Sequence, residues 1–275
     1  MATTAAETHA ADQTPTKQAG WLDPFLAEWR PGTGKPRDTR EPATGRPLLN
    51  LPQSTTDDVA RAAAAAAAAQ PAWAATSYAE RAAILRRAAE IYEAHRPEFG
   101  TWTQRETGAV HGKMHHEQNF AAGELHAAAT MPFQPYGQLV PSVVPGRLSM
   151  LRRVPAGVIG AITPWNSPTV LGMRVVAPAL AVGNAVVLKP DPQTAVCGGA
   201  VFASIFREAG LPDGLLQVVL GGADVGEAIV TDPNVTRVSF TGSTAAGRRV
   251  GSLAGGLLKR VSLELGGNNA FVVLD

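Results

Sequence analysis

The second half of the chain alternates short apolar runs with segments that have a helical period. The apolar runs lie at 158–162, 185–188, 215–220, 235–240, 260–263 and 270–274. The helical segments between them lie at 169–182, 198–209, 223–230 and 243–253. Strands buried on both faces are continuously apolar, and repeated strand–turn–helix units form parallel sheets. We therefore predict an α/β fold, a doubly wound parallel sheet of the Rossmann type, over residues 155–275.

A capping box introduces the first helix expected in the other half of the chain. Residues 54–57 read Ser-Thr-Thr-Asp and precede an alanine run at 62–69. Alanine has the highest helix propensity, so this pattern predicts a helix, closed by Pro71. A disordered alanine-rich linker is the alternative, which the cap and the nearby Trp73 disfavour.

Further helices are expected before the parallel sheet begins. A second capping box starts at Ser77, and the helix it begins is predicted to stop near Pro97. Two more helices are predicted at 98–107 and 113–129. Residues 21–131 are therefore predicted to be an N-terminal helical part that precedes the parallel sheet.

Three segments lack this periodicity. Residues 1–20 are rich in Ala, Thr and Gln and are expected to form a disordered tail. Residues 21–52 are expected to be irregular, with a short strand or two. Prolines and glycines punctuate 132–154, which predicts a hairpin that leaves the globule and returns.

Composition and charge narrow the classes of protein. The chain has 275 residues, 45% of them hydrophobic and 17% charged, with a net charge of +1. No basic block that would recruit nucleic acid is present, and no apolar stretch approaches the ~20 residues of a membrane span. The first residues lack the basic and apolar regions of a secretory signal, so we expect none. Cys197 is the only cysteine in the sequence, so no intramolecular disulfide can form. We expect a cytoplasmic globular protein.

A cluster of histidines invites a metal-site hypothesis. His111, His115 and His116 lie close to Glu117. Their spacing does not match the H-E-x-x-H pattern of zinc enzymes, and no second acidic cluster lies nearby in sequence. We therefore expect a solvated helix face and no metal site.

Two polar residues follow consecutive predicted strands in the segment 151–191. Asn166 comes after the first strand and Lys189 after the second, with a helix between them that Ser167 and Pro168 should begin. Open α/β sheets bind ligands at the carboxyl ends of their strands. We therefore expect Asn166 and Lys189 to contribute to a ligand site.

The turn at 240–247, FTGSTAAG, is a candidate anion site. A strand meets a helix at Gly242, so backbone N–H groups and the helix dipole can face an anion. The segment is not G-x-G-x-x-G, and Arg248 and Arg249 follow Gly247 where a P-loop has lysine and a hydroxyl residue. A tight turn that needs glycine only for its geometry remains an equal alternative.

A carboxylate lies at the end of a later predicted strand. Glu264 precedes Leu265, Gly266 and Gly267, and the glycines allow close approach of another molecule. If the glutamate were buried, its pKa would rise and it could act as a general base near neutral pH. An ion-paired glutamate at a strand end is the alternative.

Together these stretches resemble the NAD(P)-dependent aldehyde dehydrogenases. The matching segments, in the family's order and spacing, are PWNSP at 164–168, PALAVGN at 178–184, Lys189-Pro190, FTGST at 240–244 and ELGG at 264–267. The resemblance runs from about Trp21 to Asp275. Met173-Arg174 and the run after Lys189 are most similar to the benzaldehyde and vanillin dehydrogenase branch.

The resemblance implies roles for individual residues. Asn166 would stabilise the oxyanion of a thiohemiacetal, and Glu264 would activate the water that hydrolyses the thioester. Lys189 would bind the adenosine ribose, and Gly242 with Ser243 would hold the pyrophosphate. The residues expected around the cofactor are Ile162, Thr163, Pro164, Trp165, Asn166, Lys189, Gly222, Gly226, Phe240, Thr241, Gly242, Ser243, Val250, Glu264, Leu265 and Gly266.

The sequence departs from the family pattern at three points. Pro192 occupies a position where family members often have an acidic residue that binds the ribose. The sequence therefore does not decide between NAD and NADP as the cofactor. Val175 replaces a common lysine, so a proton relay through that position is absent. The nucleophilic cysteine is missing before the sequence stops at Asp275. Cys197 is expected to be a buried structural thiol, with a redox-sensing thiol as the alternative.

These observations predict an N-terminal fragment of an aldehyde dehydrogenase that lacks the catalytic domain and is inactive by itself. The complete protein would oxidise an aromatic aldehyde to its acid with NAD or NADP, as a homodimer or tetramer joined through an oligomerisation hairpin at 132–154. Two alternatives remain open. One is a nucleotide-binding module without catalysis, and the other is a non-catalytic subunit that pairs with complete homologues through the same hairpin.

Overall fold

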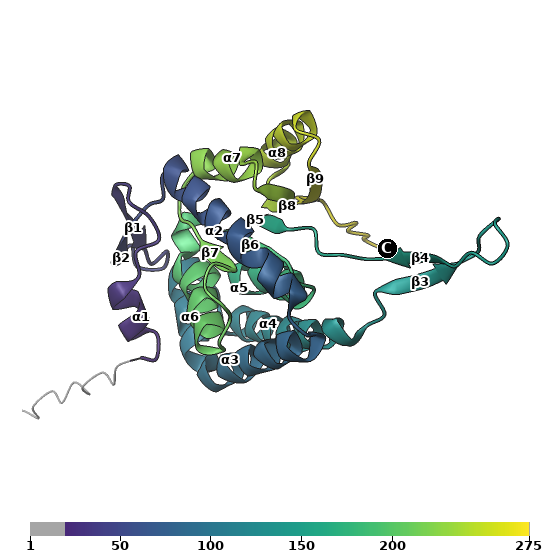
Figure 1. Ribbon diagram of the computed structural model, residues 1–275. Helices are drawn as coiled ribbons and strands as arrows, with labels where there is room; N and C mark the ends of the chain where they lie inside the picture. Colours follow the sequence, from purple (N-terminus) through teal and green to yellow (C-terminus); the bar gives the residue numbers. More distant parts are fainter. Residues whose placement is uncertain (1–19, 275) are drawn as a thin grey trace, which may run out of the picture.

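Five parallel strands form the central sheet of the computed structural model, which describes residues 20–274 (Figure 1). The predicted tail at 1–20 lies outside these residues except for Gly20. In chain order the strands are β5 (Val158–Ile162), β6 (Ala185–Lys189), β7 (Leu216–Val218), β8 (Val235–Gly242) and β9 (Arg260–Leu265). Their order across the sheet is β7-β6-β5-β8-β9.

This order confirms the doubly wound prediction. The chain runs outward from the central strand β5 through β6 to β7, and then resumes on the other side of β5 with β8 and β9. The winding direction reverses between β5 and β8. In open α/β sheets, the crevice at the carboxyl ends of such a strand pair is the usual ligand site.

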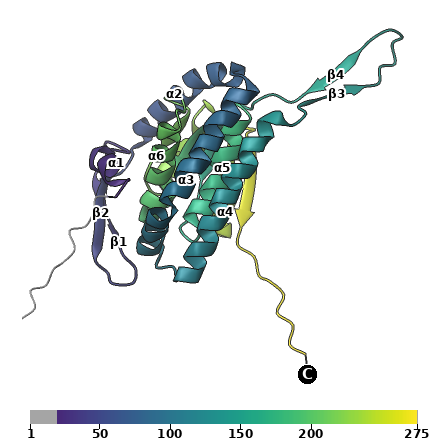
Figure 2. The ribbon, with the colours of Figure 1, turned by 90° about the horizontal axis from the view of Figure 1, so that it is seen from below.

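Helices cover both faces of the sheet (Figure 1, Figure 2). One face packs against α7 and α2, with α8 beside β8 and β9. The other packs against α5 and α6, and α3 and α4 form a further layer outside them. The bounds of these helices are α2 (Thr56–Ala75), α3 (Tyr78–Thr107), α4 (His111–Thr130), α5 (Pro168–Ala181), α6 (Val201–Glu208), α7 (Ala223–Thr231) and α8 (Thr244–Gly256).

The unit β5–α5–β6 forms as its sequence predicts. Pro168 is the first residue of α5, where its missing N–H costs nothing. At the other end Gly183 has φ +92°, and the N–H groups of Gly183 and Asn184 donate to the carbonyls of Leu180 and Ala179. This is the Schellman arrangement, which the dipeptide Gly183-Asn184 favours.

Two helix ends predicted from proline are wrong. α2 continues through Pro71 to Ala75, and α3 continues through Pro97, so the two segments expected around Pro97 form one helix. A proline inside a helix costs about 3 kcal/mol. The buried side chains that follow each proline, Trp73 in α2 and Phe99 in α3, anchor the helix on its far side and outweigh that cost.

The segment 21–52 has more structure than predicted. It contains helix α1 (Asp23–Glu28) and an antiparallel pair, β1 (Pro36–Arg40) with β2 (Pro47–Pro52). The helix predicted at 198–209 also begins differently. A 3-10 turn (Pro192–Thr194) and a π-helical turn (Val196–Ala200) precede α6.

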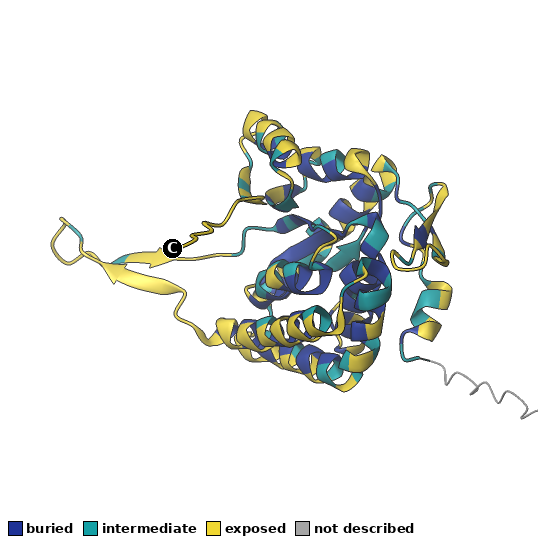
Figure 3. Cartoon of the chain, turned by 180° about the vertical axis from the view of Figure 1, so that it is seen from behind, coloured by how far each residue is buried: buried dark blue, intermediate teal, exposed yellow. Residues whose placement is uncertain are grey.

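A two-stranded hairpin projects from the body, in the segment where the sequence predicts one (Figure 1). A 3-10 turn (Met131–Phe133) leads from α4 into β3 (Gly137–Val140), which pairs with β4 (Ser149–Arg152). Every residue of β3 is exposed, and the hairpin is the most exposed arm in Figure 3. Its apolar side chains are therefore largely exposed within residues 20–274.

The last predicted strand, at 270–274, is not formed. Residues 266–274 are exposed and run away from the sheet after β9 (Figure 2). An extended apolar segment becomes a strand only where a neighbouring strand supplies hydrogen bonds, and the described residues place none beside it. None of the helices in residues 20–274 has the length and apolar composition needed to cross a bilayer.

Candidate active site

A cleft of about 840 Å³ opens at the carboxyl ends of β5, β8 and β9. Three predicted segments, far apart in sequence, line it together. The predicted residues among its walls are Pro164, Trp165, Asn166, Thr241, Gly242, Ser243, Glu264, Leu265 and Gly266. Neighbouring parallel strands end at the same edge of a sheet, so the residues at the ends of these three strands converge.

Asn166 lies in the loop between β5 and α5, and its side chain has a defined orientation. Its Oδ1 accepts a hydrogen bond from the Ser167 N–H at 3.0 Å. Within the described residues its Nδ2 group makes no hydrogen bond to the protein. The side chain is exposed to the cleft, so this N–H group is free to donate to a bound molecule.

Glu264 pairs in register with Thr241 across β8 and β9, at the cleft edge. The sequence hypothesis made its basicity depend on burial. That condition is not met, since the Glu264 side chain is exposed in the described residues. Glu264 forms no salt bridge within the described residues, so the alternative of an ion-paired glutamate is not supported.

Lys189, the last residue of β6, lies in a second group of predicted residues. Its side chain is 7% exposed, and among residues 20–274 its Nζ donates only one long hydrogen bond, 3.4 Å, to the Pro190 carbonyl. Burial lowers the pKa of Lys189, and nearby Asp191 and Asp224 partly offset this. A buried ammonium with so few acceptors is poised to donate to a ligand.

The surroundings of Lys189 leave room beside it. A Cβ placed on Gly226 would lie 3.8 Å from the Lys189 stem and from Ile162, so a larger side chain would fill this space. The neighbouring Thr163 is buried, and its Oγ1 has no hydrogen-bond partner in the part of the chain that the structure describes. Gly222 forms the N-cap of α7 beside this group.

The turn after β8 presents a helix N-terminus. Ser243 is the N-cap of α8, and its hydroxyl accepts a hydrogen bond from the Ala246 N–H. A Cβ on Gly242 would lie 2.7 Å from the Phe240 ring, so packing requires glycine here. Its φ is not in the left-handed region, so turn geometry alone does not require it. Phe240 and Val250 are buried and act as supports.

The departures from the family pattern have clear structural settings. Pro192 begins the 3-10 turn that follows β6, and Asp191 caps that turn by accepting the Gln193 N–H. Val175 lines the cleft next to Arg174, whose Nε donates to Glu124 at 2.9 Å.

Cys197 is fully buried, as the structural-thiol prediction requires. Burial raises the pKa of its thiol well above the ordinary value, and the neighbouring Glu106 raises it further. A thiol held protonated in this way is a poor nucleophile and a poor redox sensor.

Sequence reasoning missed a buried polar layer beneath the site. Glu106 in α3 accepts hydrogen bonds from the N–H groups of Val196 and Cys197, at 2.9 and 2.7 Å. Glu117 in α4 accepts the Thr169 N–H at 2.9 Å. Both glutamates are buried, so the prediction that Glu117 lies on a solvated face is wrong.

A sequence signal for Glu117 did exist. It lies four, five and eight residues before Ala121, Ala122 and Leu125, which are all buried in α4. That spacing places Glu117 on the apolar face of the helix. The histidines nearby are exposed, and no group of three or more His, Cys, Asp or Glu residues able to hold a metal occurs in residues 20–274.

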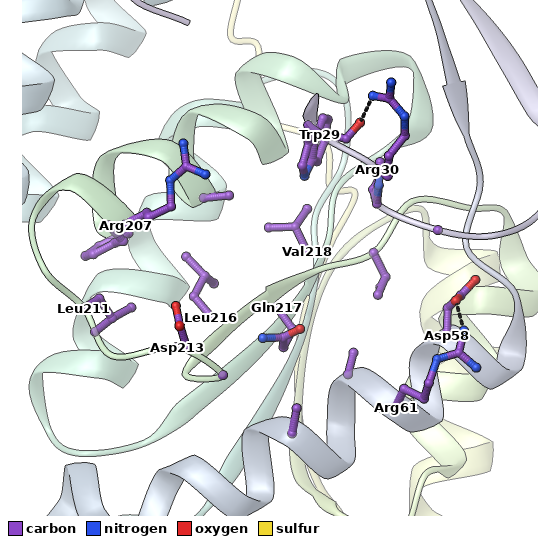
Figure 4. A pocket seen from close by; sticks show the side chains of 18 of the residues that line it. Trp29, Arg30, Asp58, Arg61, Arg207, Leu211, Asp213, Leu216, Gln217 and Val218 are labelled. Atoms are coloured by element: carbon purple, nitrogen blue, oxygen red, sulfur yellow. Dashed lines mark hydrogen bonds and ion pairs between the residues drawn. The ribbon is translucent and has the colours of Figure 1, made fainter. Parts of the chain in front are cut away.

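A second hollow, of about 640 Å³, lies along the outer edge of the sheet and contains none of the predicted site residues (Figure 4). The strand β7 forms its floor, between α2, α6 and the segment after α1. Its arginines already have partners: Arg61 pairs with Asp58, Arg30 donates to backbone carbonyls, and Arg207 lies over the Phe25 ring.

Comparison with known proteins agrees with this architecture. A model of the aldehyde dehydrogenase family matches residues 29–275, which include both residue groups around the cleft. The chain belongs to the aldehyde dehydrogenase family. The resemblance inferred from five short motifs is thereby confirmed.

Relatives within the family include enzymes of aromatic aldehydes. The chain is 54% identical to a vanillin dehydrogenase of Amycolatopsis sp. and 49% identical to a benzaldehyde dehydrogenase [NAD(+)] of Pseudomonas putida. Each match covers 91% of this chain and 51% of the relative, so the chain spans about half the length of these proteins.

Solved structures show the same fold. The crystal structure of an NAD-dependent benzaldehyde dehydrogenase from Corynebacterium glutamicum matches with a TM-score of 0.84 at 43% identity. The match covers 87% of this chain and 53% of that one.

Proposed function

We propose that this chain is the cofactor-binding part of an enzyme that oxidises an aromatic aldehyde to its carboxylic acid with NAD+. The observation that carries the proposal is the cleft at the strand ends, where Asn166, Glu264 and the N-terminus of α8 lie together in a chain of this family. The aromatic preference is supported by the names of the vanillin and benzaldehyde dehydrogenases to which it is similar.

The residues present fit a dinucleotide. Lys189 offers a buried ammonium with one weak partner, and Thr163 offers a buried hydroxyl with none in the described residues. Gly226 leaves space beside the lysine stem. In our proposal Lys189 binds the adenosine ribose, and Gly242 with Ser243 binds the pyrophosphate at the start of α8. When bound, NAD+ supplies the acceptor for the hydride that leaves the aldehyde carbon.

The two polar groups of the cleft have complementary tasks in this reaction. A thiol adds to the aldehyde carbonyl, and the Asn166 Nδ2–H donates to the oxygen that gains negative charge. After the hydride has left, Glu264 removes a proton from the water that attacks the thioester, which releases the acid and the free thiol. Cys197 is buried and is not that thiol, so residues 1–275 do not supply the nucleophile.

Expression of the 275-residue chain tests the first half of the proposal. We expect saturable binding of NADH, measured by fluorescence energy transfer from tryptophan, and no NADH production from benzaldehyde and NAD+. Clear aldehyde turnover would contradict the missing nucleophile. Absence of NADH and NADPH binding would contradict the cofactor site, and a preference for NADPH would correct the choice of cofactor.

A chimera tests the second half. Residues 1–275 are joined to the remaining half of the Amycolatopsis vanillin dehydrogenase, which is 54% identical over the matched part. We expect the chimera to oxidise vanillin or benzaldehyde, and the N166A and E264Q variants to lose most of kcat, by about 10²-fold or more. A chimera that folds and binds NAD+ with full activity in both variants would refute the roles of Asn166 and Glu264.

The projecting hairpin supports a further part of the proposal. Leu139 and Met150 face each other across β3 and β4 and are 69% and 66% exposed. Apolar side chains exposed together on a strand pair mark an interaction surface. We propose that this hairpin joins copies of the protein into a dimer or tetramer.

A further inference from the structure

Two charged residues of α4 contact the loop that carries Asn166. The Lys113 ammonium donates a hydrogen bond of 2.6 Å to the backbone carbonyl of Asn166 and another to the Glu117 carboxylate. A lysine of α4 therefore reaches this loop, while position 175 of α5 holds valine. It comes from a different helix, more than 50 residues earlier in the chain.

Glu117 contributes a second contact to the same segment. Its other carboxylate oxygen accepts the backbone N–H of Thr169, in the first turn of α5. Ser167 occupies the N-cap position of this helix, yet its side chain makes no capping hydrogen bond. Glu117 therefore performs from α4 the capping that the sequence assigns to Ser167, with its side chain only 2% exposed.

The geometry links Lys113 to the direction of the Asn166 side chain. The carbonyl of Asn166 and the N–H of Ser167 belong to one planar peptide group. The Lys113 ammonium binds the carbonyl oxygen of this peptide group. The N–H of the same peptide group, that of Ser167, donates to Asn166 Oδ1. Since Oδ1 is bound to that N–H, the Nδ2 end of the carboxamide must point away from the backbone, and rotation of the peptide plane would move it.

The support for this arrangement extends into the core. Gln118, next to Glu117, donates to the Thr103 hydroxyl at 2.9 Å and accepts a hydrogen bond from the Tyr92 hydroxyl. Thr103 in turn lies 3.3 Å from the hydroxyl of Thr169. Satisfied buried networks of this kind hold their members in one arrangement. Hydrogen bonds to α3 therefore fix the part of α4 that contacts the loop.

We propose that Lys113 and Glu117 are positioning residues that fix the Asn166–Ser167 peptide plane and thereby aim the Asn166 Nδ2 donor into the cleft. The value of this aim for catalysis rests on the proposed function, in which Asn166 stabilises an oxyanion. A donor held in place before reaction needs no reorganisation when charge develops. The positioning itself is a property of the 275-residue chain and can be measured without turnover.

Nuclear magnetic resonance of the ¹⁵N-labelled 275-residue chain tests the proposal. In K113M we expect the two Nδ2–H resonances of Asn166 to shift and broaden, and the Ser167 amide to exchange with deuterium about tenfold faster. The Val187 amide in the centre of the sheet should keep its exchange rate. K259M is the matched control, because Lys259 also donates to backbone carbonyls, those of Val230 and Asp232, far from the loop in sequence.

Two more variants separate positioning from general destabilisation. K113R retains donors for both acceptors and should restore the Asn166 resonances. E117Q keeps an oxygen for the Thr169 N–H but loses the charge that holds Lys113, so it should reproduce most of the K113M effect. Unchanged Asn166 resonances and Ser167 exchange in K113M, or equal changes in K259M, would overturn the proposal.

Cofactor binding in the same samples distinguishes this inference from the proposed function. If wild type binds no NADH but K113M still perturbs Asn166, the proposed function fails and the positioning stands. If NADH binds to all variants and Asn166 is unperturbed in K113M, the positioning fails and the cofactor site stands. Unfolding of K113M would appear as loss of Val187 protection, and K113R and E117Q would then decide the outcome.

Discussion

At the residue scale, two buried polar groups to which the described residues supply little hydrogen bonding lie on the proposed cofactor side of the site. Lys189 and Thr163 both lie at the carboxyl edge of the sheet and are both buried. Burial of polar groups is unfavourable unless they are hydrogen-bonded, and here the protein supplies little of that bonding. A bound ligand that accepts hydrogen bonds would remove the deficit, which makes Lys189 a direct test.

Lys189→Met should weaken NADH binding roughly ten- to hundredfold, the expected loss for a hydrogen bond from a charged donor. The methionine retains the apolar stem that packs beside Gly226, so the fold should persist. Titration followed by NADH fluorescence measures the change. Lys259→Met, which removes a lysine that binds carbonyls elsewhere, should bind NADH as wild type does. Equal affinities for wild type and Lys189→Met would exclude the lysine from the site.

Glu106 gives a prediction for stability against pH. Burial raises the pKa of this carboxyl from 4.5 to about 7, despite the N–H groups of Val196 and Cys197 that favour its charged form. Between these values the folded chain keeps the proton that the unfolded chain releases. The contribution of Glu106 to the free energy of unfolding should therefore be largest below pH 4.5. That contribution should fall by about 3 kcal/mol as the pH rises to about 7.

The measurement is urea unfolding at a series of pH values. Glu106→Gln cannot titrate, so the difference in unfolding free energy between wild type and this variant should change over that window and be constant above it. A difference that is independent of pH between 4.5 and 7 would show that Glu106 titrates at its ordinary value.

At the element scale, tertiary contacts decide where the long helices end. Pro71 and Pro97 carry a strong local signal for a helix end, yet both helices continue past them. In α2 the anchor is Trp73, which is buried and donates from its indole Nε1 to the Leu180 carbonyl at 2.8 Å. That carbonyl lies 107 residues away, so no local pattern could reveal it.

Trp73→Phe should lower the free energy of unfolding by about 2–3 kcal/mol. The change removes one buried hydrogen bond and leaves a void where the second ring of the indole packs. Urea denaturation followed by circular dichroism measures it. Trp165→Phe is the matched control, because Trp165 is 58% exposed and its replacement should change stability by less than about 0.5 kcal/mol. Similar losses in both variants would show that Trp73 does not anchor α2.

At the scale of the whole molecule, the chain divides into a packed body and an exposed arm. The body buries most of its apolar side chains in one large core around the sheet, and a small second cluster holds Leu51, Ala195 and Leu220. The hairpin of β3 and β4 exposes its own and projects away from that core (Figure 3). Exposed apolar strands of this kind either bind a partner or promote aggregation. Binding to a second copy of the chain can be tested directly.

The double variant Leu139→Lys with Met150→Glu should abolish self-association of the chain. The two side chains are opposite each other in the hairpin, so the new charges attract and keep the strands paired while the apolar surface is lost. Sedimentation velocity measures the change. Val110→Lys, a similar substitution at an exposed valine at the start of α4, should assemble as wild type does. Assembly of the double variant would place the interface elsewhere.

The sequence alone determined the sheet class, the βαβ unit and the convergence of three loops. Those features depend on local signals, namely apolar runs, glycine and proline at turns, and caps, and on the rule that neighbouring parallel strands end at one edge. The strand ends predicted a ligand site at Asn166 and Lys189, and the family resemblance added Ser243 and Glu264 to it.

Only the tertiary structure decided which polar residues support that site. The spacing of Glu117 indicates the apolar face of its helix, but no local pattern shows which groups Glu106 and Glu117 bind, because their partners lie 90 and 52 residues further along the chain. A carboxylate is stable in the core only where backbone N–H groups from another element meet it, and that meeting is a result of packing. Tertiary packing also keeps α2 and α3 helical beyond their prolines. Likewise, the segment at 270–274 forms no strand where no neighbouring strand pairs with it, because a strand needs a partner and not only a pattern.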